Sequence, residues 1–189
     1  MNKHSEEVSD NAGLSDSWNV VREGPIPEGT LGDQWARMIR WKNKLDNLYA
    51  GSVREFDASA AEDVVYVFFV TCYHVADWIK NDPSLTTKDD PLAYARSSPA
   101  LRICRDVANG HKHLSLNSTA TASDTRLAHR AVTWEDANSG LKATPHYRFS
   151  VEWTDQGEPQ SKDCKELAKE CVAEWMSFLD NPENGFQTS

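Results

Sequence analysis

The sequence predicts a mainly helical protein, a bundle of about four long helices with a β-hairpin inserted before the last one. Apolar residues recur at helical spacing over several long segments, which is typical of helices that pack against one another. Capping and breaking residues lie at the ends of these segments. The alternation of apolar and polar side chains that is typical of strands lies within residues 128 to 154, the range expected for the hairpin. The length of 189 residues suits one domain, expected over 18–189, after an acidic tail over 1–17 that we expect to be disordered.

Two helices are expected in the first half of the chain. The first begins at Asp33, which caps it, and ends near Ala50, just before Gly51. The second covers residues 59 to 81 and is apolar nearly all round, so we expect it at the centre of the bundle. Its polar side chains Asp63, His74 and Asp77 share one sector and are expected to find partners on the helix that contains Arg105.

A third long helix is expected from Ser98 to Leu114, after a short helix over residues 92 to 96 that begins with Asp90 and Pro91. Ser98 can cap its first turn, and proline is favoured at the position that follows. A helical projection divides its side chains into two faces. One face is polar, and it comprises Arg102, Arg105, Asp106, Asn109, Lys112 and His113. The other is apolar, apart from His111, and comprises Ile103, Cys104, Val107, Ala108 and Leu114.

The C-terminal third predicts a hairpin followed by a helix. Strands are expected over residues 130 to 134 and 146 to 153, with a turn between them over residues 136 to 140 and an end at Gly157. Asp163 is expected to cap the last helix. That helix carries a regular apolar stripe of Cys164, Leu167, Ala168, Cys171, Val172, Trp175, Phe178 and Leu179.

Composition narrows the classes of function. The net charge of -9 argues against broad binding to nucleic acid, yet residues 92 to 118 hold four arginines or lysines and a single acid, which could form a local phosphate site. The four cysteines form no CxxC pair and lie in apolar stretches, so we expect buried free thiols. With no signal peptide and no apolar run that could span a bilayer, a cytoplasmic protein is expected. Glycine-rich phosphate loops and a GxSxG motif are absent, and no cofactor is expected.

The segment Arg105-Asp-Val-Ala-Asn-Gly-His111 resembles the short motif of HEPN domains, in which an arginine and a polar residue are followed a few positions later by a histidine. The wider layout, with Tyr73-His74 and Trp78 on the preceding long helix, is also similar to HEPN-like bacterial proteins. HEPN domains are helical bundles, commonly dimeric. Many are metal-independent RNA endonucleases of toxin-antitoxin and other defence systems.

The resemblance implies an active site where two such motifs meet across a homodimer. A histidine would act as general acid or base at the ribose 2′-hydroxyl, and an arginine would bind the scissile phosphate. The catalytic residues expected on this basis are Arg105, His111, His113 and Asp106. The residues expected to bind substrate are Arg102, Asn109, Lys112 and His74, with no metal. RNA and an antitoxin or defence protein are the implied partners.

Two other interpretations stay open. In the first, the arginines, Asp106, Asn109 and His113 form a structural polar network in a non-catalytic interaction module. In the second, His74, Asp77, His111 and His113 hold zinc or iron. Which histidine faces Arg105 depends on whether the helix breaks at Asn109-Gly110, since Asn-Gly favours helix termination.

Overall fold

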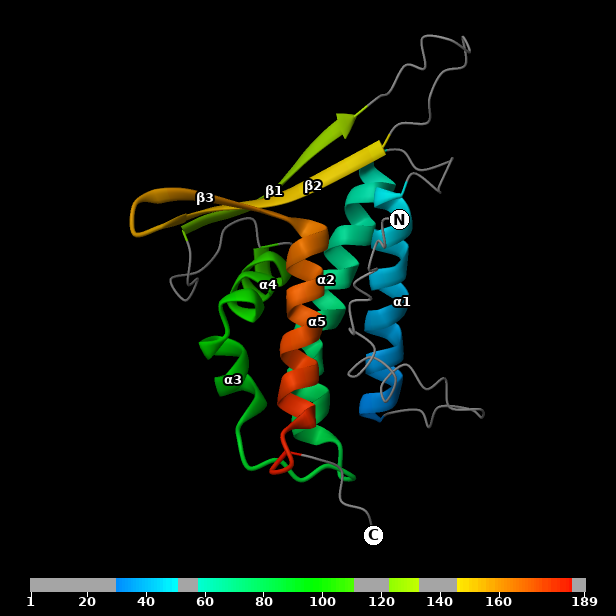
Figure 1. Ribbon diagram of the computed structural model, residues 1–189, viewed down its shortest axis with the longest axis vertical. Helices are drawn as coiled ribbons and strands as arrows, with labels where there is room; N and C mark the ends of the chain where they lie inside the picture. The colour runs from blue at the N-terminus through cyan, green and yellow to red at the C-terminus, as the bar shows by residue number, and fades with distance from the viewer. Residues whose placement is uncertain (1–29, 51–57, 111–122, 133–145, 185–189) are drawn as a thin grey trace, which may run out of the picture.

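The computed structural model describes residues 30–50, 58–110, 123–132 and 146–184. These residues form five helices and one antiparallel sheet of three strands, so the protein is mostly helical, as predicted (Figure 1). The elements in chain order are α1 (Leu31–Tyr49), α2 (Ala58–Asn81), α3 (Pro91–Ser97), α4 (Pro99–Gly110), β1 (Ser123–Val132), β2 (His146–Asp155), β3 (Glu158–Asp163) and α5 (Cys164–Asp180). The long helices α1, α2 and α5 lie alongside one another, and the sheet crosses one end of them (Figure 1).

Helix α1 is present as predicted, but its N-cap lies three residues earlier than expected. Thr30, rather than Asp33, is its N-cap, and the backbone N–H groups of Asp33 and Gln34 donate to the Thr30 carbonyl. Asp33 lies within the first turn and pairs with Arg37 at 3.1 Å. Acidic side chains stabilise a helix both at the N-cap and within the first turn. Asp33 therefore correctly indicated the start of a helix, but the prediction that it is the N-cap was wrong.

Helix α2 is confirmed as the central long helix, with ten buried residues along its length. The expectation that its polar stripe is buried is wrong for two of the three residues, since Asp63 and Asp77 are exposed and His74 is half-buried. A helix surrounded by neighbours on most sides still has one strip facing solvent, and the two carboxylates occupy that strip.

The capping predictions for α3, α4 and α5 are confirmed. The Asp90 side chain accepts from the Leu92 N–H at 3.0 Å, and the Ser98 hydroxyl accepts from the Leu101 N–H at 3.3 Å. At the start of α5, Asp163 accepts from the N–H groups of Lys165 and Glu166. Every residue of the predicted apolar stripe of α5 is buried.

The sheet is more than the predicted inserted hairpin. Strand β2 pairs with β1 on one side and with β3 on the other, in the order β1-β2-β3. Gln156 and Gly157, expected to end the strands, instead form a two-residue turn with φ of 50° and 87° that leads into β3. Such a turn matches the twist of a hairpin. Strand β3 was missed because its sequence, Glu-Pro-Gln-Ser-Lys-Asp, has no apolar alternation and four of its six residues are exposed.

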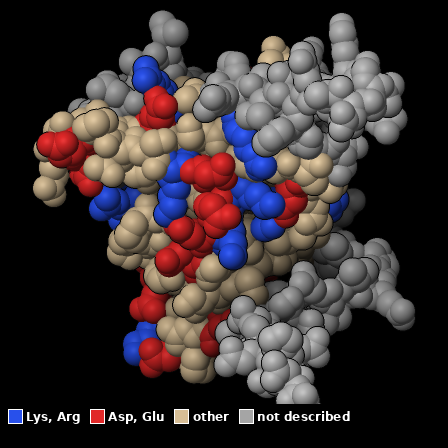
Figure 2. All heavy atoms as spheres, turned by 45° about the horizontal axis from the view of Figure 1, so that its top comes forward, with Lys and Arg blue, Asp and Glu red and all other residues tan. Residues whose placement is uncertain are grey.

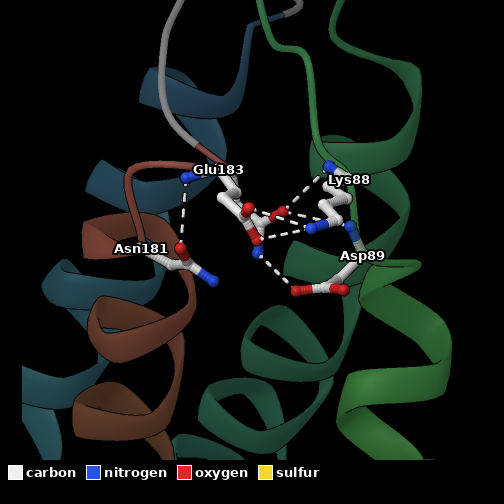
Figure 3. A network of polar contacts seen from close by, with 5 residues as sticks. Lys88, Asp89, Asn181 and Glu183 are labelled. Atoms are coloured by element: carbon white, nitrogen blue, oxygen red, sulfur yellow. Dashed lines mark hydrogen bonds and ion pairs between the residues drawn. The ribbon is translucent and has the colours of Figure 1, made fainter.

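Polar contacts fasten the C-terminal end of α5 to the segment between α2 and α3 (Figure 3). Asn184 is 1% exposed, and its side-chain oxygen accepts from the backbone N–H groups of Lys88 and Asp89. Its amide group donates to the Asp89 carboxylate at 3.1 Å. Outside this buried contact, Lys88 and Glu183 form an exposed ion pair of 2.9 Å.

Several expectations concern residues outside the described ranges. They include the acidic tail over 1–17, the stretch from His111 to Leu114, the end of the first predicted strand at Trp134 and the turn over 136–140. Within the described residues, none of the helices has the length and apolar character that crossing a membrane requires.

Candidate functional site

Helix α4 carries the candidate site, and its apolar face fixes how the arginines are presented. Residues Leu101, Ile103, Cys104, Val107 and Ala108 are buried where α4 packs on α2 and α5. Arg102, Arg105, Asn109 and Gly110 are half-buried along the other side. The two arginines are three positions apart, so their side chains are neighbours on the helix surface.

Asp106 and Arg105 form the central ion pair of the site. The Arg105 guanidinium donates from Nε at 3.1 Å and from Nη2 at 2.8 Å to Oδ1 of Asp106. The Asp106 side chain is 1% exposed and that of Arg105 is 14% exposed. The prediction that Asp106 lies on the open polar face is therefore corrected: the carboxylate is buried beside the arginine and fixes the plane of its guanidinium.

Arg102 provides an unsatisfied donor next to this pair. Its Nε atom is buried, and among the described residues it has no hydrogen-bond partner. A buried donor without an acceptor costs about 1–3 kcal/mol, so such a group calls for an explanation such as a bound anion or water. An anionic oxygen would satisfy this donor.

Helix α2 contributes a residue, Tyr73, that the sequence analysis named only within the family resemblance and did not assign to the site. Burial raises the pKa of Tyr73, and the positive charge of Arg105 opposes this rise, which places the phenol within the field of the arginine. The ring of Tyr73 lies 6.5 Å from that of the predicted site residue His74, which is half-buried. Tyr73 directly precedes His74 in the sequence, but an uncharged phenol is not singled out by a search for charged groups.

The remaining predicted site residues are only partly covered by the structure. Asn109 is half-buried near the end of α4, which remains helical through Gly110. Lys112, His111 and His113 lie outside the described residues, so the identity of the histidine that faces Arg105 stays a prediction.

The metal site proposed from His74, Asp77, His111 and His113 gains no support from the described part. Asp77 is exposed, and its backbone carbonyl accepts from the Asn81 side chain. Among the described residues, the side chains that converge as metal ligands are instead three cysteines, Cys72, Cys104 and Cys171, which are all fully buried. The expectation of buried free thiols is confirmed for all four cysteines of the chain.

The surface charges are mixed rather than segregated on the face that Figure 2 draws. Lysines and arginines alternate there with aspartates and glutamates. Ion pairs between exposed or half-buried groups, such as Arg126 with Glu152 and Lys162 with Glu170, are examples of this mixing. Mixed charges of this kind do not form an extended basic surface on the face that is drawn. An anion site on this acidic protein is therefore expected to be local, such as the pair Arg102 and Arg105.

Comparison with known proteins assigns the chain to no family. No protein-family model matches it, and no curated protein or solved structure matches it significantly.

Proposed function

We propose that the protein is an HEPN-like domain that binds and cleaves RNA at the arginine site of α4. The observation that carries this proposal is the buried, unsatisfied Nε of Arg102 beside an Arg105 guanidinium that Asp106 holds in place. Guanidinium groups bind phosphate oxygens in well-defined geometry, and a phosphate would supply an acceptor for the Arg102 Nε, which has none among the described residues.

The proposed chemistry divides the work among these residues. Arg105 and Arg102 bind the scissile phosphate and stabilise the charge that develops on it. A histidine, His111 or His113, takes the proton of the ribose 2′-hydroxyl, which attacks the phosphate and expels the 5′-oxygen. Asp106 is a positioning residue, since it is buried against Arg105 and would not reach the substrate. In this proposal two copies of the chain form a homodimer that brings two such motifs together, and a cognate antitoxin or defence protein restrains the activity.

The test is RNA cleavage by the purified full-length chain in the presence of a chelator. Wild type, Arg105→Ala, His111→Ala and His113→Ala are incubated with single-stranded and structured RNA. Arg126→Ala is the matched control, because Arg126 is an exposed arginine of β1 that pairs with Glu152 of β2. We expect cleavage by wild type and by the control, loss of at least about a hundredfold in Arg105→Ala, and a similar loss for one histidine variant. Absence of cleavage by wild type, or equal cleavage by all variants, would overturn the proposal.

A second measurement separates substrate binding from catalysis. An RNA with a 2′-deoxy sugar at each position cannot be cleaved by this route but presents the same phosphates. We expect Arg102→Ala to weaken its binding by about tenfold, because one phosphate contact is lost, and the histidine variants to bind it normally.

The second candidate is a non-catalytic helical interaction module in which the arginine cluster is structural. The observation that favours it is the depth of the Arg105–Asp106 pair, whose carboxylate is 1% exposed. Removing one partner of a buried pair leaves a buried charge and costs several kcal/mol. In this case Asp106→Ala lowers the free energy of unfolding by roughly 3 kcal/mol, exposed Asp63→Ala changes it little, and wild type cleaves no RNA.

A further inference from the structure

Three cysteines from three different helices converge at one point of the core. They are Cys72 of α2, Cys104 of α4 and Cys171 of α5, and their Sγ atoms all lie within 4.8 Å of one another. The three residues are 32 and 67 positions apart in the chain, so no local motif brings them together. The fold itself builds the cluster where α2, α4 and α5 pack.

The surroundings of the cluster hold the sulfurs in place. Each of the three residues is 0% exposed. The Cys104 thiol donates to the Phe69 carbonyl at 3.4 Å, the Cys171 thiol donates to the Ala100 carbonyl at 3.5 Å, and the Trp175 indole donates to the Cys72 carbonyl at 3.1 Å. These hydrogen bonds link α4 to α2, α5 to α4 and α5 to α2 around the three sulfurs.

The distances between the sulfurs suit one ion bound by three thiolates. With metal–sulfur bonds of about 2.3 Å, three sulfurs lie about 4 Å apart around a planar centre and about 3.5 Å apart around a pyramidal one, and the cluster reaches either spacing with small side-chain shifts. A tetrahedral zinc site needs a fourth protein ligand, and among the described residues no further histidine, cysteine or carboxylate joins the group. The geometry therefore favours a soft ion that accepts three sulfur ligands.

The net charge of the complete complex distinguishes among the soft ions. Three thiolates with a divalent ion leave one negative charge in an apolar core, and with a monovalent ion they leave two. A trivalent ion leaves none, which avoids the cost of a buried net charge.

We propose that Cys72, Cys104 and Cys171 form a binding site for trivalent arsenic or antimony. Arsenite, As(OH)₃, reacts with the three thiols so that three As–O bonds break and three As–S bonds form. Each thiol proton leaves with one hydroxide as water, and no atom changes oxidation state. The bound atom ties α4 to α2 and α5, so binding stabilises the folded chain. This proposal stands independently of RNA cleavage.

The test is titration of the reduced full-length protein with sodium arsenite, followed by native mass spectrometry. We expect one arsenic atom per chain with the loss of three protons, together with a higher melting temperature. Cys164→Ala is the matched control, because Cys164 is equally buried but lies outside the cluster. It is expected to bind as wild type does, whereas Cys72→Ala, Cys104→Ala and Cys171→Ala each bind at least about tenfold more weakly.

Wild-type protein alone gives a second readout if a core variant fails to fold. At a low denaturant concentration that opens the core transiently, arsenite is expected to protect Cys72, Cys104 and Cys171 from an alkylating reagent and to leave Cys164 unprotected. Peptide mapping measures the alkylation of each thiol. Equal alkylation of the four cysteines with and without arsenite, or normal binding by the three cluster variants, would overturn the site. Stoichiometric Zn²⁺ binding at these cysteines that is tighter than that of arsenite would overturn the choice of a trivalent ion.

Discussion

At the residue scale, a single tyrosine hydroxyl completes the edge of the sheet. The Tyr49 hydroxyl donates to the Phe149 carbonyl at 2.7 Å and accepts from the Phe149 N–H at 3.0 Å. Strand β3 pairs with β2 only from Ser150 onward, so this side of Phe149 has no neighbouring strand within the described residues. Tyr49 takes the place of that strand and joins the end of α1 to the sheet.

We predict that Tyr49→Phe lowers the free energy of unfolding by about 1–3 kcal/mol. The substitution keeps the aromatic ring but removes the hydrogen bonds that the hydroxyl makes with the backbone N–H and carbonyl of the buried Phe149, both of which lose that partner. Chemical denaturation of both proteins measures the difference. Tyr73→Phe is the comparison, since that half-buried hydroxyl has no hydrogen bond among the described residues, and a loss of similar size there would contradict the role given to Tyr49.

Asp106 shows where residue-level prediction failed at the candidate site. The helical projection placed it with the arginines because the method assigns faces from charge and spacing. In the structure it lies at the boundary of that face, and its side chain is only 1% exposed. Whether a residue at the boundary of a helix face is buried depends on how close the neighbouring elements come. The spacing of residues within one helix does not give that distance.

At the element scale, the turn between β2 and β3 depends on two residues with positive φ. Gln156 has φ 50° and Gly157 has φ 87°. Positions of this kind in two-residue hairpins favour Asn followed by Gly. A Cβ atom at Gly157 would meet no atom within 4 Å, so any cost of adding one comes from the backbone conformation alone.

We predict opposite effects for two substitutions in this turn. Gly157→Ala is expected to lower the free energy of unfolding by about 1 kcal/mol, because an alanine is strained at this φ. Gln156→Asn is expected to raise it by a few tenths of a kcal/mol, because asparagine tolerates positive φ better than glutamine does. Thermal unfolding of both variants provides the measurement. If alanine at position 157 left the melting temperature unchanged, the turn would not be held in this conformation.

The elements that could be predicted from the sequence are those with strong local signals. The apolar stripe of α5 and the caps at Asp90, Ser98 and Asp163 were all found, because each signal lies within a few adjacent residues. Strand β3 could not be found, since it is stabilised by pairing with β2 rather than by its own sequence. The cysteine cluster was missed for a related reason, because its members lie on three helices whose packing no single segment specifies.

At the scale of the whole molecule, buried polar groups fasten the end of the bundle that lies opposite the sheet (Figure 1). Asn184 joins the end of α5 to the segment before α3. Asp82, which is 6% exposed, joins α2 to α1: one carboxylate oxygen accepts from the Leu31 N–H at 2.7 Å, and the other accepts from the N–H and hydroxyl of Ser84. The carboxylate therefore satisfies the N-terminus of α1, where the helix has unpaired donors.

This contact makes the stability of the protein depend on pH in a defined direction. Burial alone would raise the pKa of Asp82, but the hydrogen bonds from Ser84 and Leu31 outweigh it and hold the pKa below that of an ordinary carboxyl. A carboxyl with a lower pKa in the folded state stabilises the fold above its unfolded pKa of about 3.9, and this contribution disappears as the pH falls through the folded value. Acid is thus expected to weaken the attachment of α1 to α2.

We predict that Asp82→Asn lowers the free energy of unfolding by about 1–2 kcal/mol at pH 7, since the amide keeps one acceptor oxygen but loses the charge that strengthens all three hydrogen bonds. The difference from wild type should shrink below about pH 4, where the unfolded wild-type chain begins to bind a proton at Asp82, and vanish once the pH has fallen through the lower folded pKa. Urea unfolding at a series of pH values measures both curves. Asp155→Asn, at an exposed aspartate at the end of β2, is the control and should follow wild type throughout. A constant difference between Asp82→Asn and wild type down to about pH 2 would show that the charge of Asp82 is not what joins the two helices.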